Sequence, residues 1–126
     1  MAYHLSKQRF GELVEKALAD LPEPFATHLE EVSVEIRTRP TPKQLKKAGL
    51  DEDELLLGLY QGHPLTERSV LQSGTLPDVI YIFQEDVELV SDSEEQLVEE
   101  VRTTVLHEMG HHFGMSEDDL DELGYS

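Results

Sequence analysis

The sequence predicts a single α+β domain, residues 1–126, in which helices pack on a small sheet. Three observations support this class. Apolar residues recur at helical spacing near both ends of the chain, and strand-like apolar segments lie between them. No repeat, linker or low-complexity segment divides the sequence. With 38% hydrophobic residues, a chain of this length can bury a core.

The first half of the chain begins with a helix that Ser6 can cap and that Pro22 and Pro24 end. Its apolar stripe consists of Phe10, Leu13, Val14, Ala17, Leu18 and Leu21. Residues 32–37 alternate apolar and polar side chains and predict a half-buried strand. Thr41 before Pro42 predicts a short helix that ends at Gly49.

The second half begins with two further predicted strands, residues 55–62 (LLLGLYQG) and 79–83 (VIYIF), separated by an irregular loop. A long helix follows from Asp92 or Ser93 through Met109, with Ser93 and Gln96 at capping-box spacing. Gly114 is expected to end this region, and Ser116 to start a last short helix.

The chain is strongly acidic, with a net charge of −17. A negative field repels polyanions, so nucleic acid and anionic membranes are not expected as partners. The chain has no cysteine, which excludes thiolate metal sites and disulfides. Its apolar runs are far shorter than the ~20 residues of a membrane span, and its first residues lack the apolar run of a signal peptide. A cytoplasmic location is therefore expected.

The predicted long helix contains an HExxH motif, His107-Glu108-Met109-Gly110-His111. Histidines four residues apart lie on one helix face, where both imidazoles can reach one zinc ion. Glu108 lies about 100° further round the helix, outside the ligand set, where a general base can contact a zinc-activated water. A chain of this composition contains HExxH by chance with a probability of about 4%. The probability falls to about 0.3% when a glycine three residues after the second histidine is also required, so the pattern favours a catalytic metal site.

A catalytic zinc needs a third protein ligand, and a turn at Gly114 can return the acidic segment after it to the metal. Glu117 is favoured and Asp118 is its alternative, although acidic residues in a first helical turn also stabilise the helix dipole. We expect about one Zn²⁺ per chain. His112 is expected to be a structural, hydrogen-bonded histidine, and His4 and His28 to be solvated.

The segment HEMGHHFG with Glu117 resembles the metzincin pattern HExxHxxGxx(H/D), with glutamate in the last position. From RFGELVEKALADLPEPF to its end, the chain resembles a family of minimal, single-domain bacterial zincin-like metallopeptidases. The resemblance implies a zincin-like α+β fold, a small mixed sheet with an active-site helix that carries HExxH. It also implies that His107 and His111 are zinc ligands and that Glu108 is the catalytic base.

The expected function is therefore that of a zinc-dependent hydrolase, a metallopeptidase that cleaves a peptide or protein substrate. The alternative is a metal-stabilised binding or regulatory module with little or no turnover. A peptide is expected to add to an edge strand, either VIYIF or LLLGLY. Four residues are candidate transition-state donors: Tyr60, His63, Arg68 and Tyr125.

Overall fold

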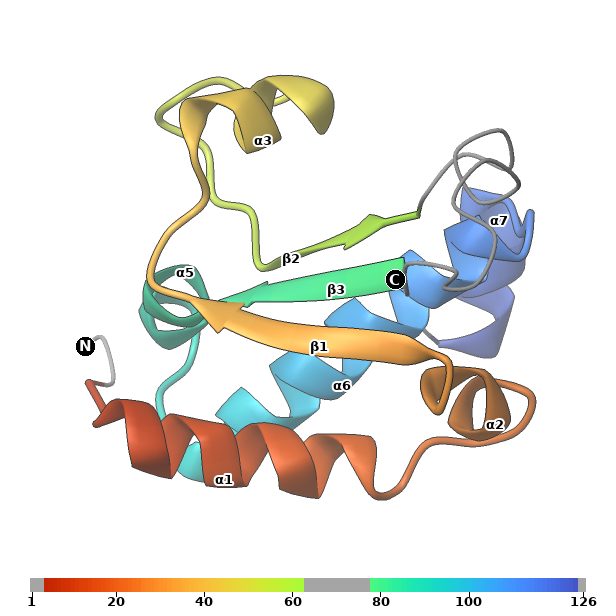
Figure 1. Ribbon diagram of the computed structural model, residues 1–126, viewed down its shortest axis with the longest axis horizontal. Helices are drawn as coiled ribbons and strands as arrows, with labels where there is room; N and C mark the ends of the chain where they lie inside the picture. The colour runs from red at the N-terminus through yellow and green to blue at the C-terminus, as the bar shows by residue number, and fades with distance from the viewer. Residues whose placement is uncertain (1–3, 63–77, 125–126) are drawn as a thin grey trace, which may run out of the picture.

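The computed structural model describes residues 4–62 and 78–124. Three strands, β1 (Val32–Arg37), β2 (Gly58–Gln61) and β3 (Asp78–Phe83), form a sheet in the order β1-β3-β2. β1 is parallel to β3, and β2 is antiparallel to it. Helices α1 and α6 pack together along one side of this sheet (Figure 1). The predicted α+β class with a small mixed sheet is confirmed.

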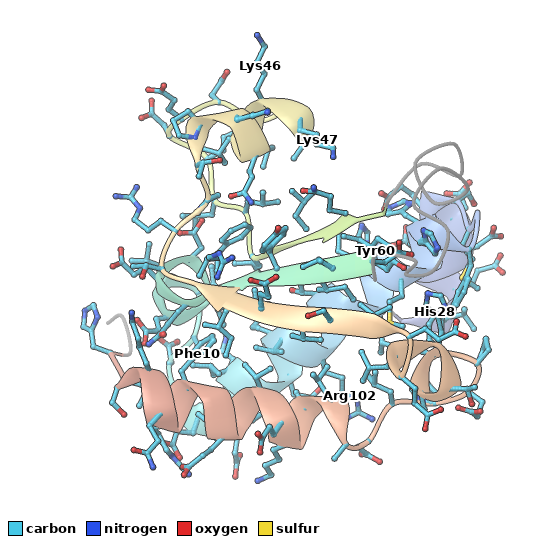
Figure 2. The ribbon with its side chains drawn as sticks, viewed as in Figure 1. Phe10, His28, Lys46, Lys47, Tyr60 and Arg102 are labelled. Atoms are coloured by element: carbon cyan, nitrogen blue, oxygen red, sulfur yellow. The ribbon has the colours of Figure 1, made fainter. Side chains whose placement is uncertain are left out.

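Helix α1 (Lys7–Leu18) begins as predicted, because the Ser6 hydroxyl accepts a hydrogen bond from the backbone N–H of Arg9. Its apolar stripe faces the core, and the fully buried Phe10 points from α1 toward the sheet (Figure 2). The alternate residues Ile80 and Ile82 of β3 meet the same core. Helix α1 and the central strand thus share one hydrophobic layer.

The middle of the chain differs from the prediction in the length of one strand. Helix α3 (Pro42–Lys47) forms with the expected Thr41 cap, and Gly49 follows it with a φ of 77°. Strand β2, however, starts only at Gly58. The N–H of Leu56 donates to the buried carboxylate of Asp86 at 2.9 Å, so a side chain and not a sheet partner binds the backbone N–H at this position.

Two short helices were not predicted, α2 (Phe25–Leu29) and α5 (Gln84–Leu89). The N-cap residues, Pro24 of α2 and Phe83 of α5, have no capping side chain, and at α2 it is the preceding Glu23 that accepts from the N–H of Thr27. The usual sequence signal for a helix start is therefore missing at both.

The long predicted helix is α6 (Glu94–His112), and the last helix is α7 (Glu117–Leu123). The Ser93 hydroxyl caps α6 at the N–H of Gln96, but the Gln96 side chain accepts from Asp92 and does not complete a capping box. The apolar stripe of α6 is fully buried at Leu97, Val101, Val105 and Met109. Among the described residues, no helix is both long and apolar enough to cross a membrane.

A candidate zinc centre at the end of helix α6

The last turns of α6 present His107 and His111 on the side away from the buried stripe. Their imidazole Nε2 atoms lie 3.0 Å apart, and the two rings meet edge to face. The side chains are 26% and 40% exposed, so an ion held between them would be open to solvent on one side. This arrangement follows from the i, i+4 spacing read in the sequence.

A sharp turn brings the acidic segment back to these histidines. Gly114 has a φ of 85°, a conformation that favours glycine, and the N–H of Met115 donates to the carbonyl of Gly110 at 2.9 Å. Ser116 then caps α7 in a complete capping box with Asp119. Glu117 is consequently the first residue of α7.

Helix α7 is held against α6 by one buried residue, Leu120, which is 0% exposed. It packs directly on Gly110 inside the HExxH motif, where an added Cβ would overlap the Leu120 side chain. Glycine at this motif position therefore permits the close approach of the two helices. Because Glu117 lies one turn before Leu120, this contact also sets where the Glu117 carboxylate lies.

Glu117 completes a group of three potential ligands. Its Oε1 lies 2.8 Å from Nε2 of His111 and 3.5 Å from Nε2 of His107. Ligands bound at 2.0–2.1 Å in a tetrahedral site lie about 3.3 Å from one another, so the three atoms match the spacing that zinc requires. Two imidazoles, a carboxylate and a side open to solvent form a donor set typical of catalytic zinc.

The structure does not bring Asp118 to this group. Within the described residues, the potential ligand atoms that converge here belong to His107, His111 and Glu117. Asp118 was the alternative to the favoured Glu117, in case a cap at Ser116 turned Glu117 outward. Ser116 does cap α7, in a capping box with Asp119, and Glu117 still reaches both imidazoles.

Glu108 faces β2, on a different side of α6 from the two histidines. Its Oε1 accepts a hydrogen bond of 3.0 Å from the backbone N–H of Tyr60. Burial raises the pKa of Glu108 above the ordinary carboxyl value, and this hydrogen bond acts in the opposite direction. A buried carboxylate with a raised pKa beside a metal site has the properties of a general base.

The contact between Glu108 and Tyr60 depends on a second close approach, between β2 and α6. A Cβ on Gly58 would lie 2.7 Å from Cγ2 of Thr104 and 2.9 Å from the carbonyl oxygen of Tyr81. Thr104 lies one helical turn before Glu108, and Gly58 lies two residues before Tyr60 on the strand. The close approach of Gly58 to Thr104 therefore also brings Tyr60 close to Glu108. The packing of Gly58 on Thr104 was not predicted from the sequence, although a glycine inside an apolar strand pattern is a known signal of close backbone approach.

Two expectations are corrected by the sheet order and by the position of Tyr60. Residues 79–83 belong to the central strand, so of the two candidate segments only LLLGLY supplies an edge strand. The Tyr60 hydroxyl donates to Asp78 at 2.6 Å and lies 3.0 Å from Nε2 of His28, so its role at the site comes from its backbone amide. The other candidate donors, His63, Arg68 and Tyr125, lie outside the described residues.

The remaining histidines differ from each other in their surroundings. His4 is 82% exposed, as expected for a solvated side chain. His28 was also expected to be solvated, but it is only 19% exposed and packs against Tyr60, His112 and Phe113. The sequence contains no local signal for this, because these residues come from three different elements.

The chain is similar to known proteins in sequence and in structure. Residues 29–125 match the sequence model of a family described as zincin-like metallopeptidase. Among solved structures, the chain is similar to a conserved hypothetical protein from Thermo thermophilus, with 29% sequence identity and a TM-score of 0.56. That similarity covers 86% of this chain and 94% of the other. No curated protein matches the sequence.

Proposed function

Because this chain belongs to the zincin-like metallopeptidase family, we propose that it is a zinc-dependent peptidase that acts on peptide or protein substrates. The observation that carries the proposal is the convergence of His107, His111 and Glu117 beside a buried glutamate, Glu108. The family match supports the metallopeptidase class, and the ligand spacing supports zinc as the metal.

His107, His111 and Glu117 would hold the ion, and Asp118 would stay in solvent. Bound zinc supplies a Lewis acid that polarises a peptide carbonyl and activates water at neutral pH. In the proposed site the two imidazoles come from one rigid helix and the carboxylate comes from the packed start of α7. The ligands are thus placed by secondary structure and not by a flexible loop.

Glu108 would accept the proton of the attacking water and later donate it to the leaving amine. In the metal-free chain burial raises the pKa of Glu108, and a zinc ion close by would act in the opposite direction, so its role as base rests on its position. The Tyr60 amide holds one carboxylate oxygen in place, and the second oxygen remains for the proton. The position of Glu108 supports this proposed role as the base.

The outer edge of β2 would bind the substrate backbone. The carbonyl of Leu57 accepts from Phe83, so alternation along the strand directs the backbone groups of Gly58 and Tyr60 away from β3. The amide of Tyr60 already donates to Glu108 on this outer side. A peptide added along β2 would therefore pair with the other outward backbone groups of the strand and pass beside the proposed base.

The test combines metal analysis with cleavage of a diverse peptide library by the full-length chain. We expect about one zinc at the His107 group and cleavage that a chelator abolishes. Glu108→Gln should retain zinc and lose about 10²-fold or more in rate, since it keeps an acceptor for Tyr60 and removes the base. Glu99→Gln, an exposed glutamate on the same helix, is the matched control and should cleave normally.

Two results would contradict the proposal. If the protein takes up no transition metal, the proposed zinc centre does not exist. Zinc binding without cleavage of any library peptide would instead support the metal-stabilised binding module as the function.

A further inference from the structure

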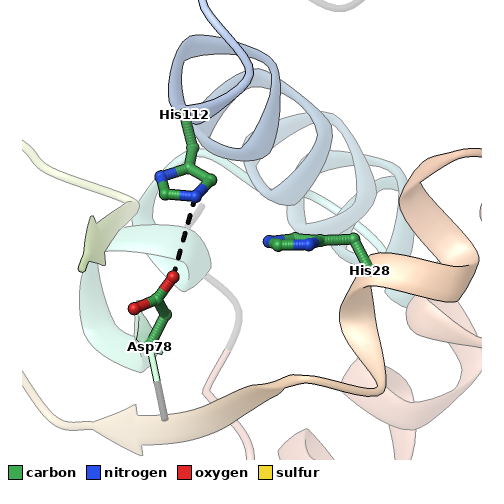
Figure 3. Close-up of side chains that lie close together, drawn as sticks. All are labelled: His28, Asp78 and His112. Carbon is green, nitrogen blue, oxygen red and sulfur yellow. Dashed lines mark ion pairs between the residues drawn. The ribbon is translucent and has the colours of Figure 1, made fainter. Parts of the chain in front are cut away.

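A second group of potential ligands lies around the buried carboxylate of Asp78. His28 from α2, Asp78 from the start of β3 and His112 from the end of α6 converge, with their potential ligand atoms within 4.8 Å of one another (Figure 3). This group shares no residue with His107, His111 and Glu117. We propose that it is a second metal site, which takes a divalent transition metal such as Zn²⁺ and joins the three elements.

One pair of ligand atoms lies near the spacing of a tetrahedral site. Nε2 of His112 lies 3.7 Å from Oδ2 of Asp78, compared with about 3.3 Å between neighbouring ligand atoms of zinc. All the potential ligand atoms lie within 4.8 Å of one another, so the side chains would move closer together to bind one ion. Two imidazoles and a carboxylate are also suitable ligands for zinc.

Tyr60 holds these side chains near one another without a metal. Its hydroxyl donates to Oδ2 of Asp78 at 2.6 Å and lies 3.0 Å from Nε2 of His28. Its ring stacks on the imidazole of His112 at a centroid distance of 4.3 Å. The ligands therefore start near their bound positions, and the tyrosine oxygen is within reach as a further donor.

Metal-bound histidines usually donate their second ring nitrogen to a carboxylate, a carbonyl or water. In His28, Nε2 faces the group, and Nδ1 lies on the side of Glu31, whose Oε2 is 3.7 Å away and beyond hydrogen-bond distance. A shorter contact to Glu31 in the metal-bound state would supply this support. The nitrogen that would coordinate is therefore Nε2.

Burial and charge also favour a cation here. Asp78 is 6% exposed, and the attraction between a carboxylate and a bound cation is stronger where water is excluded. The net charge of −17 attracts cations to the chain as a whole. Because His28, Asp78 and His112 lie far apart in the sequence, an ion bound to them would stabilise the fold around the end of α6.

The site predicts two zinc equivalents per chain, one more than the sequence analysis expects. Titration of metal-free protein with Zn²⁺, followed by calorimetry, should resolve two binding events. Asp78→Asn keeps an acceptor for Tyr60 and removes the charge, so it should weaken one event by at least about 100-fold. His28→Gln at the partly exposed end of the group should do the same, and it provides the test if Asp78→Asn fails to fold.

Two controls separate this site from the proposed catalytic centre. His4→Gln, at the exposed histidine, should retain both events. His111→Ala should lose the catalytic event and keep the second one. The proposal is overturned if wild type binds one equivalent that His111→Ala removes, or if a second equivalent survives both Asp78→Asn and His28→Gln. A His111→Ala protein that keeps both events would instead contradict the catalytic centre alone.

Discussion

Replacing Leu120 with alanine should weaken zinc binding although Leu120 is not a ligand. Leu120 is the buried residue of α7, and it packs on Gly110 of α6 one turn after Glu117. A helix as short as α7 is not stable by itself in water, so its position depends on this contact. Loss of the contact should release Glu117 from the two histidines.

The size of the effect follows from the burial of the side chain. Leu120 is 0% exposed, and truncation of a fully buried leucine to alanine costs about 2–5 kcal/mol. A chain of this length has a free energy of unfolding of about 6–19 kcal/mol, so the fold as a whole should survive. The lost stability is that of the contact between α7 and α6. We expect zinc affinity to fall about 10- to 100-fold, which is the usual effect of replacing a residue that positions a metal ligand without binding the metal itself.

The assay compares Leu120→Ala with Leu123→Ala, which truncates an exposed leucine of the same helix. Denaturant unfolding of the metal-free proteins measures the loss of stability, and competition with a chromophoric chelator measures zinc affinity. The zinc affinity of Glu117→Ala gives the value expected when the Glu117 ligand is lost completely. Leu123→Ala should match wild type in both measurements.

The reasoning would be refuted if Leu120→Ala lost about 2 kcal/mol or more of stability and still bound zinc as tightly as wild type. In that case the docking of α7 would not place a ligand. If Leu120→Ala, Leu123→Ala and Glu117→Ala all bound zinc with wild-type affinity, Glu117 would not be a zinc ligand.

Three further predictions concern Glu108, Gly58 and the metal itself. In metal-free protein, burial raises the folded-state pKa of Glu108 above its unfolded value, so stability falls as pH rises through the folded-state pKa. Glu108→Gln should therefore be more stable than wild type at neutral pH, and denaturant unfolding should show this difference disappear below about pH 3, where the carboxyl is protonated in both states. Gly58→Ala should cost about 1–3 kcal/mol by overpacking against Thr104 and the Tyr81 carbonyl. Gly11→Ala in α1, whose added Cβ has no contact closer than 3.9 Å, should instead stabilise by about 0.5–1 kcal/mol, and equal unfolding curves for the two would contradict the packing argument. Zinc at 100 times its dissociation constant should add about 2.7 kcal/mol of stability, seen as a higher thermal midpoint that excess chelator reverses.

The sequence alone predicts most of the local structure. Side-chain caps at Ser6, Thr41, Ser93 and Ser116 mark the starts of four helices, and the structure places a cap at each. The helical period also predicts that His107 and His111 share a face. Helices α2 and α5 were missed because their N-cap residues, Pro24 and Phe83, are not capping residues. Strand β2 is shorter than its apolar run because Asp86 binds the N–H of Leu56.

The tertiary structure decided what surrounds the motif. It placed residues 79–83 at the centre of the sheet, the amide of Tyr60 on Glu108, and His28 beside Asp78 and His112. Tyr60 and Glu108 are 48 residues apart, and the pattern of neither segment indicates the other. Periodicity and capping act within a few residues along the chain, so the sequence by itself determined the helix that carries HExxH. Contacts between elements depend on how closely they pack, and here that depends on Gly58 against Thr104 and on Gly110 against Leu120.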